Sequence, residues 1–255
     1  MEIRILGCNG SRGKELKPTA FLVDGKLLID AGTASEVLDD KERAKIDHIL
    51  ITHSHIDHTG DLPFLAESAF DMRMKPIFVH SIKEAIEAIS SNIFNWRIWP
   101  NFAEIPNRKG SKLSYKILKP LKKIKVGSYF VTPIPVNHTV PTVGYLIDNG
   151  KTAFSFIGDT YCTDLIWREI RKNKRLRAVF IESSFPNRLE KDAKLTGHLT
   201  PELLYNEISK LGMENIQIYV THLKPLYRDE IISELKGLSK KLPLKILEDG
   251  MKIKI

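Results

Sequence analysis

Three histidines and one aspartate lie within residues 53–58, directly after a short apolar run. His53 and His55 are two positions apart, so an extended chain points both imidazoles to the same side. This spacing excludes the helical zinc-protease pattern, in which the paired histidines are four positions apart. The chain must then turn to bring in Asp57 and His58. Because imidazole and carboxylate are donors for zinc, manganese and iron, the segment predicts a metal site. Four ligands would close off a single ion, so we predict two ions side by side.

Three further candidate ligands are spread along the chain: His138, Asp159 and His222. Each follows a run of residues that predicts a strand, at the point where that strand ends. Loops at strand ends carry functional residues because a rigid scaffold positions them. We therefore expect these three side chains on the same rim as residues 53–58.

The elements that must position these residues follow from the alternation of apolar runs and turn signals. Strands are predicted at 2–7, 19–30, 48–51, 75–80, 129–137, 142–147, 151–157, 178–182 and 216–220. Helices are predicted at 34–45, 60–70, 82–93, 164–172 (capped by Thr163), from Pro201 to near Gly212 (capped by Thr200) and 228–240. Alternating strands and helices are expected up to Lys125, and a closing hairpin is expected over 243–255. Two blocks of strands, each flanked by helices, predict two sheets packed face to face with helices outside.

In this context, the motif Thr-His-x-His-x-Asp-His at residues 52–58 resembles the signature of the metallo-β-lactamase-fold hydrolases. The resemblance implies an α/β (α+β) fold, a four-layer αββα sandwich. It implies a single domain over residues 1–255, built from two fused ββα-type halves.

The same resemblance implies two divalent metal ions and assigns their ligands. The first ion would be held by His53, His55 and His138, the second by Asp57, His58 and His222, with Asp159 bridging both. Only a carboxylate among these side chains can offer an oxygen to each of two ions about 3.5–4 Å apart. Zinc is the first expectation for the metal, and manganese or iron are the alternatives.

His198 stands apart from these ligands because it precedes a predicted helix N-terminus, where backbone N–H groups favour an anion. An imidazole also titrates in the range that suits proton transfer. In the phosphodiesterases that this stretch resembles, a histidine in a Gly-His-x-Thr setting protonates the leaving group. A glutamate like Glu182 orients that histidine. Thr200 and Lys224 are further candidates for substrate binding, although a solvated role for Lys224 is equally open.

Several longer blocks are similar to the class II 3′,5′-cyclic-nucleotide phosphodiesterases. They are Gly158-Asp159-Thr160, residues 182–187 (Glu-Ser-Ser-Phe-Pro-Asn), residues 197–201 (Gly-His-Leu-Thr-Pro), residues 221–225 (Thr-His-Leu-Lys-Pro) and residues 94–101. This resemblance implies hydrolysis of a small anionic cyclic nucleotide to a 5′-nucleotide by a hydroxide that bridges the metals. His198 would protonate the departing 3′ oxygen, with Glu182 in support. Asp57 could act as a ligand, as a base, or as both.

The nearest alternative is the tRNA 3′-processing endonuclease, which shares the metal ligands and acts on RNA. Bacterial forms carry an arm for tRNA between the ligands that match His138 and Asp159. These residues are only 159 − 138 = 21 positions apart here, and two strands with their turn fill that interval. An endonuclease of this kind, or another phosphodiesterase of the same fold, remains the second interpretation.

The composition is that of an ordinary globular protein. The chain has 255 residues, of which 42% are hydrophobic and 27% charged, and no apolar run approaches the roughly 18 residues of a membrane span. Its two cysteines, Cys8 and Cys162, form no disulfide framework. We therefore expect a cytoplasmic protein with no membrane partner. The net charge of +8 indicates solvated faces or a field that attracts anionic substrates.

Two features remain open at this point. The aromatic stretch 94–102 could pack in the core, form a subunit contact in a homodimer, or stack on a nucleobase. His48 and His80 lie in predicted strands outside the motif, and we expect structural roles for both.

Overall fold

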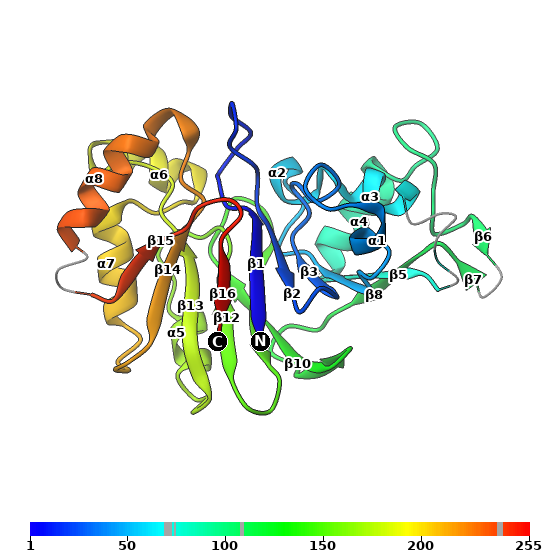
Figure 1. The fold of residues 1–255 in the computed structure, drawn as a ribbon. Coiled ribbons are helices and arrows are strands. Elements are labelled where there is room, and N and C mark those ends of the chain that lie inside the picture. The colour runs from blue at the N-terminus through cyan, green and yellow to red at the C-terminus, as the bar shows by residue number, and fades with distance from the viewer. Residues whose placement is uncertain (69–72, 74, 108–109, 239–241) are drawn as a thin grey trace.

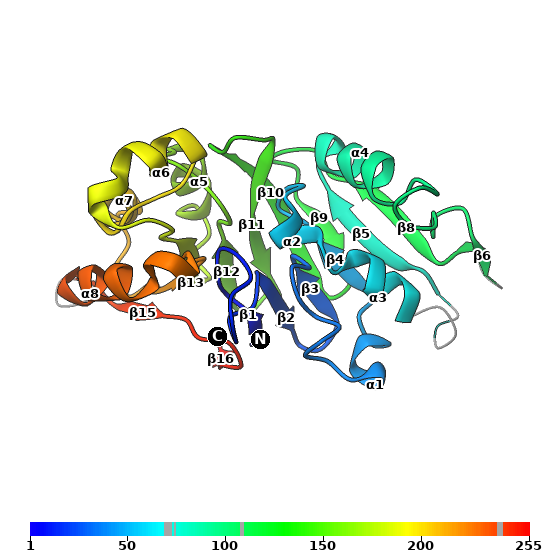
Figure 2. The same cartoon turned by 90° about the horizontal axis from the view of Figure 1, so that it is seen from above.

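Two seven-stranded sheets pack face to face, and helices cover the outer face of each (Figure 1). The view from above shows the same arrangement, with α5–α8 on one side and α1, α3 and α4 on the other (Figure 2). This computed structural model describes all residues except 69–72, 74, 108–109 and 239–241. The predicted αββα sandwich is confirmed. Whether the two halves form one folding domain stays a prediction.

The first sheet has the strand order β16-β1-β2-β3-β4-β5-β8. Its strands are β1 (Glu2–Gly7), β2 (Ala20–Val23), β3 (Leu27–Ile29), β4 (His48–Leu50), β5 (Ile77–Ser81), β8 (Leu113–Ile117) and β16 (Lys252–Lys254). Strands β3, β4, β5 and β8 pair in parallel, so their carboxyl ends lie at one edge of the sheet. The histidine motif leaves the sheet at this edge, directly after β4.

The second sheet has the strand order β15-β14-β13-β12-β11-β10-β9. Its strands are β9 (Ile124–Val126), β10 (Tyr129–Val136), β11 (Thr142–Asp148), β12 (Ala153–Phe156), β13 (Leu176–Glu182), β14 (Gln217–Thr221) and β15 (Leu244–Ile246). Strands β12 to β15 are parallel, and β10 runs in the same direction because β11 is antiparallel to both β10 and β12. The carboxyl ends of β10, β12, β13 and β14 therefore meet at one rim.

The helices are α1 (Asp40–Arg43), α2 (Ile56–Thr59), α3 (Leu62–Ser68), α4 (Lys83–Asn92), α5 (Leu165–Ile170), α6 (Glu190–Thr196), α7 (Pro201–Ser209) and α8 (Arg228–Leu238). The 3₁₀ turns η1 (Asn187–Leu189) and η2 (Pro225–Tyr227) and a small hairpin of β6 (Pro106–Asn107) and β7 (Gly110–Ser111) complete the described elements.

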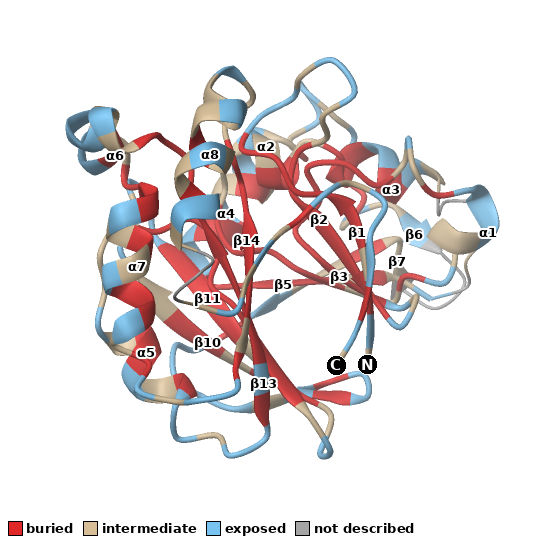
Figure 3. Ribbon diagram, turned by 60° about the vertical axis from the view of Figure 1, so that its left-hand side comes forward, coloured by how far each residue is buried: buried red, intermediate tan, exposed pale blue. Residues whose placement is uncertain are grey.

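Three layers of apolar side chains hold the sandwich together. The central layer lies between the sheets and includes Phe21, Tyr145, Phe156 and Phe180, with the rings of Phe21 and Phe156 4.9 Å apart. Separate clusters lie under the helices of each half. Figure 3 shows this as buried strands enclosed by helices with exposed outer faces. Burial of this apolar area is the main force that fixes the strand ends at the rim.

The helix predicted at 34–45 is wrong for most of its length. Only α1 is helical, and its N-cap is Asp39, whose side chain accepts from the N–H of Glu42 in a capping box. The preceding residues instead turn around a carboxylate, because Asp61 Oδ2 accepts the N–H groups of Ala34 and Ser35 at 2.7 and 2.5 Å.

The alternation of strands and helices expected up to Lys125 is also wrong. After α4, the described residues 93–125 hold turns and strands but no helix. Side chains take up backbone donors here: Asn95 Oδ1 accepts the N–H groups of Arg97 and Ile98 at 3.0 and 2.8 Å. Such bonds compete with helix formation.

Two predicted ends of elements differ as well. Asp164, not Thr163, occupies the N-cap of α5, and the Thr163 N–H donates to Glu207 Oε2 at 3.1 Å.

The prediction of a closing hairpin over 243–255 is wrong: β15 pairs with β14 in the second sheet, whereas β16 pairs with β1 in the first. The turn between them crosses from one sheet to the other. Long-range pairing overrides the local turn signal at Asp249-Gly250.

The aromatic stretch divides between core and surface. Phe94 and Phe102 are buried with their rings 6.3 Å apart, and Trp99 packs on Phe64 at 5.4 Å. Trp96 and Ile98 are exposed. The packing prediction holds for the buried rings, and the roles in substrate binding and dimer formation stay predictions. Among the described helices, none combines the length and the apolar content needed to cross a bilayer.

Candidate active site

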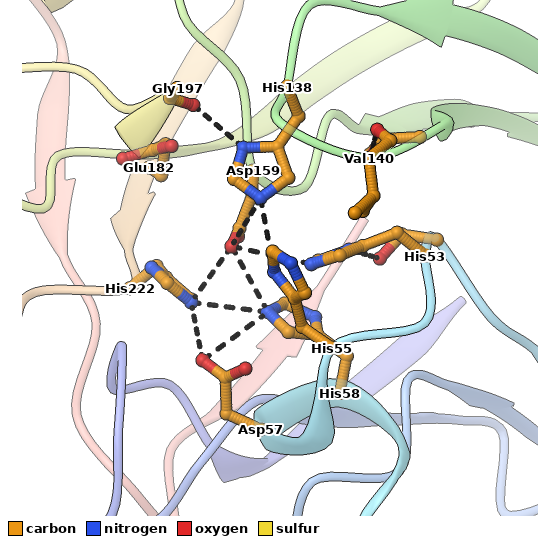
Figure 4. Close-up of polar contacts among 12 residues, drawn as sticks. His53, His55, Asp57, His58, His138, Val140, Asp159, Glu182, Gly197 and His222 are labelled. Carbon is orange, nitrogen blue, oxygen red and sulfur yellow. Dashed lines mark hydrogen bonds and ion pairs between the residues drawn. The ribbon is translucent and has the colours of Figure 1, made fainter. Parts of the chain in front are cut away.

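The seven predicted metal ligands all lie at the rim where the carboxyl ends of the strands meet (Figure 4). His53 follows β4, His138 follows β10, Asp159 follows β12 and His222 follows β14. Sequence reasoning therefore placed these residues at the right strand ends. Their role as ligands stays a prediction, because proximity alone does not show binding.

The motif turns as its spacing requires. The chain stays extended through His55, which is the N-cap of α2, and Asp57 and His58 lie in the first turn of that helix. The helix is only one turn long, so it serves mainly to present these two side chains to the rim. His58 is fully buried, whereas the Asp57 side chain keeps about a quarter of its surface exposed.

The atoms of the seven predicted ligands fall into two groups, each within a 4.8 Å span, and a third such group joins His198 to Asp159 and His222. One group contains His53, His55, His138 and Asp159, and the other contains Asp57, His58 and His222. These groups coincide with the two ligand sets expected from the sequence. Within them, His138 Nε2 lies 3.2 Å from His55 Nδ1, and His58 Nε2 lies 3.1 Å from His222 Nε2.

Asp159 lies between the two groups. Its Oδ2 is 3.3 Å from the Nε2 atoms of both His58 and His222, and 3.7 and 4.0 Å from those of His53 and His138. One buried carboxylate thus faces imidazoles of both sets, as a bridging ligand must.

A further layer of polar groups orients four of the rings. Asp30 Oδ2 lies 2.8 Å from His58 Nδ1, and the Gly197 carbonyl lies 2.9 Å from His138 Nδ1. Hydroxyl oxygens stand beside two other rings: Thr52 Oγ1 is 3.0 Å from His53 Nδ1, and Ser184 Oγ is 3.0 Å from His222 Nδ1. Such contacts fix the tautomer and leave the other nitrogen free for a metal.

Burial and charge act in opposite directions on the ionisable groups. Burial alone would raise the pKa of Asp159, but the surrounding imidazoles, led by His222 and His58, hold it well below its usual value. For His58 burial opposes the charged ring, and the carboxylates of Asp159 and Asp30 overcome this and raise its pKa. Burial lowers the pKa of His53, which favours the neutral ring that binds metals.

The residues fit a bound cation on two further observations. Asp159 Oδ1 and His53 Nε2 are buried and have no hydrogen-bond partner in the part of the chain that the structure describes. Orphaned polar atoms of this kind are costly unless another group satisfies them. The nitrogen and oxygen donors also suit zinc, manganese or iron, and they do not select one of the three.

His198 and Glu182 form a hydrogen-bonded pair beside the ligands. His198 Nδ1 lies 2.7 Å from Glu182 Oε1, and both side chains are buried. Burial opposes the charged imidazole, but the glutamate outweighs it and raises the pKa of His198 above its usual value. The N–H groups of Thr160 and Leu199 also donate to Glu182, at 2.9 and 3.2 Å, and hold the carboxylate in place.

The two remaining candidates have clear positions. Lys224 Nζ lies 5.2 Å above the Phe185 ring, and its charge acts on His198. Thr200 is buried and caps α7, where its Oγ1 accepts from the Leu203 N–H at 3.4 Å. Contact of either residue with a substrate stays a prediction.

The sequence predicts that Asp30 ends a strand with its carboxylate toward the same rim, and the structure places this carboxylate against His58. Sequence reasoning missed Ser184. Ser184 links the His198–Glu182 pair to the predicted metal ligands, because its Oγ contacts Glu182 Oε2 and His222 Nδ1. Its position two residues after Glu182 was the only signal.

The sequence profile described as class II cAMP phosphodiesterases matches residues 39–246. The chain belongs to this family. It is 28% identical to a 3′,5′-cyclic-nucleotide phosphodiesterase of Aliivibrio fischeri, over 84% of this chain and 79% of that protein. A protein of Yersinia pestis, named a probable 3′,5′-cyclic-nucleotide phosphodiesterase, is 27% identical over 76% of this chain. The matched part of this chain spans 63% of the length of the Yersinia protein.

Other relatives come from the wider fold. A ribonuclease Z of Methanococcus maripaludis is 27% identical over 89% of each chain. Unliganded yeast PDE1 superposes with a TM-score of 0.81 at 21% identity, covering 98% of both chains. The metallo-β-lactamase-fold protein YhfI of Bacillus subtilis gives a TM-score of 0.77 at 17% identity, over 99% of this chain and 98% of that one. The predicted fold, the predicted family and the assignment as a hydrolytic enzyme are confirmed.

Proposed function

We propose that this family member hydrolyses 3′,5′-cyclic nucleotides to 5′-nucleotides and uses two divalent metal ions. The observation that carries the proposal is the His198–Glu182 pair, which lies beside the ligand groups. The atoms of Asp159, His198 and His222 lie within 4.8 Å of one another, so an acid and the ligands can face one phosphate. Metal ligands alone would fit many hydrolases, whereas this pair adds a proton donor.

The metal ions would be held by the two groups described above, with Asp159 shared between them. When bound, the ions supply Lewis acidity: they lower the pKa of coordinated water and offset the charge of phosphate oxygens. Zinc is the first candidate for both positions.

His198 has the properties of the acid that protonates the departing 3′ oxygen. Its Nδ1 is engaged by Glu182, so Nε2 is the nitrogen left to donate. Its raised pKa favours the protonated ring, because the paired carboxylate stabilises that charged form. Glu182 therefore orients and supports His198.

Two other side chains would position the substrate. Lys224 would contribute positive charge toward phosphate from beside His198, and Asp57 combines a ligand position with partial exposure to the rim. That exposure allows Asp57 to contact a substrate or water as well as a metal. Thr200 would act through the start of α7, which it caps.

RNA 3′-end processing is the second candidate function, and the likeness to ribonuclease Z favours it. The structure offers little room for an added arm between His138 and Asp159. Residues 138–159 contain β11, β12 and short turns, and all of these residues are described. A small substrate is the better fit to this compact rim.

Parallel assays on four substrates test the proposal: cyclic AMP, cyclic GMP, a bis-aryl phosphodiester and a tRNA precursor. We expect cyclic-nucleotide hydrolysis that yields a 5′-nucleotide and stops when a chelator removes the metals. Cleavage of the tRNA precursor with no turnover of either cyclic nucleotide would refute the proposal. Fewer than about one ion per chain in protein purified without chelator would refute the two-metal site.

A further inference from the structure

His222 adopts an unusual backbone conformation. Its φ of 61° lies in the left-handed region, which a residue with a side chain occupies only when its surroundings hold it there. The His222 N–H donates to the Cys8 carbonyl at 2.7 Å, and its own carbonyl accepts from Ser184 Oγ at 2.9 Å. The conformation that aims this ring at the site therefore depends on a segment more than 200 residues away in sequence.

That segment is the loop of residues 8–17, which we term the clamp loop. Besides Cys8, its Gly10 N–H donates to the Leu223 carbonyl at 3.1 Å. A Cβ atom on Gly10 would lie 2.7 Å from His222 Nδ1 and 2.7 Å from the His222 carbonyl oxygen. Only glycine allows this approach, so the clamp loop contacts both the backbone and the ring of His222.

Both ends of the clamp loop are tied to one carboxylate. Asp249 accepts from the Cys8 N–H at 2.9 Å and from the Lys17 N–H at 2.9 Å, and Asn9 Nδ2 donates to it at 3.1 Å. Asp249 lies in the turn that crosses from β15 to β16. Its neighbour Gly250 donates to the Ile5 carbonyl at 2.8 Å, which anchors the turn to the first sheet.

We propose that Asp249 is a positioning residue for the metal centre. It closes the clamp loop, and the clamp loop holds His222 in its left-handed conformation with the ring aimed at Asp57 and Asp159. This proposal rests on the proposed function in one respect, since it takes His222 to be a ligand of the second metal. Asp249 touches neither substrate nor metal and acts only through the loop.

The test is a two-step titration of metal-free protein with Co²⁺, followed by absorption spectroscopy and by competition with a chromophoric chelator. Asp249→Ala should weaken the site that contains His222 by about 10–100-fold, the range for residues that orient metal ligands. The site that contains His53, His55 and His138 should keep its affinity. Asp249→Asn retains one acceptor oxygen, so we expect a smaller loss at the same site.

Asp148→Asn is the matched control. Like Asp249, Asp148 accepts from backbone and side-chain donors, including Gly150 N–H at 2.7 Å. It is buried, whereas Asp249 is half-buried, and it lies at the opposite end of β11 from the rim. This variant should lose thermal stability without changing either Co²⁺ affinity. A structural role for Asp249 would give the same result as the control, so selective loss of one site separates the two explanations.

Gly10→Ala provides an independent variant that leaves Asp249 intact. The added methyl group should displace the His222 ring and cause the same selective loss. The proposal would be overturned if folded Asp249→Ala, or Asp249→Asn where the alanine variant does not fold, bound both ions with wild-type affinity. Retention of both affinities in Gly10→Ala would equally overturn it. Wild-type protein that binds no metal would instead refute the proposed function.

Discussion

The protein has two groups of histidines, and they differ in whether carboxylates hydrogen-bond to the rings. At the rim, His58 and His198 are hydrogen-bonded to Asp30 and Glu182, and burial is outweighed so that both pKa values are raised. Between the sheets, His48 Nδ1 lies 3.1 Å from His80 Nε2, and the rings pack with Phe78. Among the described residues, no carboxylate hydrogen-bonds to either ring of this second pair.

The two rim rings that have a carboxylate partner therefore shift in the opposite direction from the second pair, whereas burial lowers the pKa values of the rim residues His53, His55 and His138. Burial lowers the pKa of His48, and it lowers the pKa of His80 to about 3. Burial therefore favours the neutral form of both rings, and the structural role expected for His48 and His80 stays a prediction. Clustered histidines alone do not make a metal site: the buried carboxylates beside them favour a cation.

The largest effect on the contrast between the two histidine groups is expected when the charge of the central carboxylate, Asp159, is removed. Asp159→Asn should abolish most metal binding and lower cyclic-nucleotide turnover on the order of 10⁴-fold, because both groups of ligands lose their shared anion. Metal analysis and steady-state kinetics measure this. Asp164→Asn is a control, since its side chain is 90% exposed. Two ions bound with full affinity in Asp159→Asn would contradict the bridging role.

His198→Ala separates proton donation from metal binding. We expect turnover to fall by about 10²–10⁴-fold with the metal content unchanged, the range for loss of a general acid. Loss of metal in this variant would show that His198 is a ligand, which its place near Asp159 and His222 allows.

Asp30→Asn tests the carboxylate that orients His58. The amide cannot stabilise the imidazole in the same way, so metal affinity should fall by about 10–100-fold while the protein stays folded. Competition with a chelator measures the affinity. Asp61→Asn serves for comparison because Asp61 binds the backbone of Ala34 and Ser35 rather than a histidine. An equal loss in both variants would argue against a specific role for Asp30.

The smallest effect is expected at the second pair. Because the folded-state pKa of His80 is lowered, the unfolded chain binds more protons below about pH 6.5. The contribution of neutral His80 to the free energy of unfolding is therefore complete above that pH and is lost as the pH falls toward about 3. Between pH 7.5 and pH 5, the free energy of unfolding of the wild-type protein should fall by about 1–2 kcal/mol more than that of His80→Gln. Denaturant unfolding of both proteins measures the difference, and parallel curves would count against the assignment.

Much of the site was predictable because its determinants are local. The spacing of His53, His55, Asp57 and His58 specifies a turn at a strand end, and apolar runs mark the strands that precede His138, Asp159 and His222. The sequence also identified His198 and Glu182 through their surrounding blocks. These features could be predicted because short stretches of sequence specify both the types of the ligands and the ends of the strands.

The rest depends on contacts between distant segments. Asp249-Gly250 reads as a hairpin turn, yet its two flanking strands join different sheets, because pairing with β14 and β1 outweighs the local signal. The helix expected at 34–45 is replaced by a turn around Asp61 for the same reason. Ser184 meets His222 because β13 and β14 are neighbours in the second sheet. Asp249 meets the clamp loop because the turn between β15 and β16 crosses to the first sheet.

The clamp loop also has a consequence for the order of events during synthesis. Cys8 and Asp249 are separated by 241 positions, so the anchor emerges from the ribosome long after the loop that it holds. If Asp249 acts as proposed, a nascent chain that has exposed His53, His55 and His138 can assemble the first ligand group but cannot yet fix His222. The ions would then load in sequence, and the second would be retained only after the crossing turn has closed.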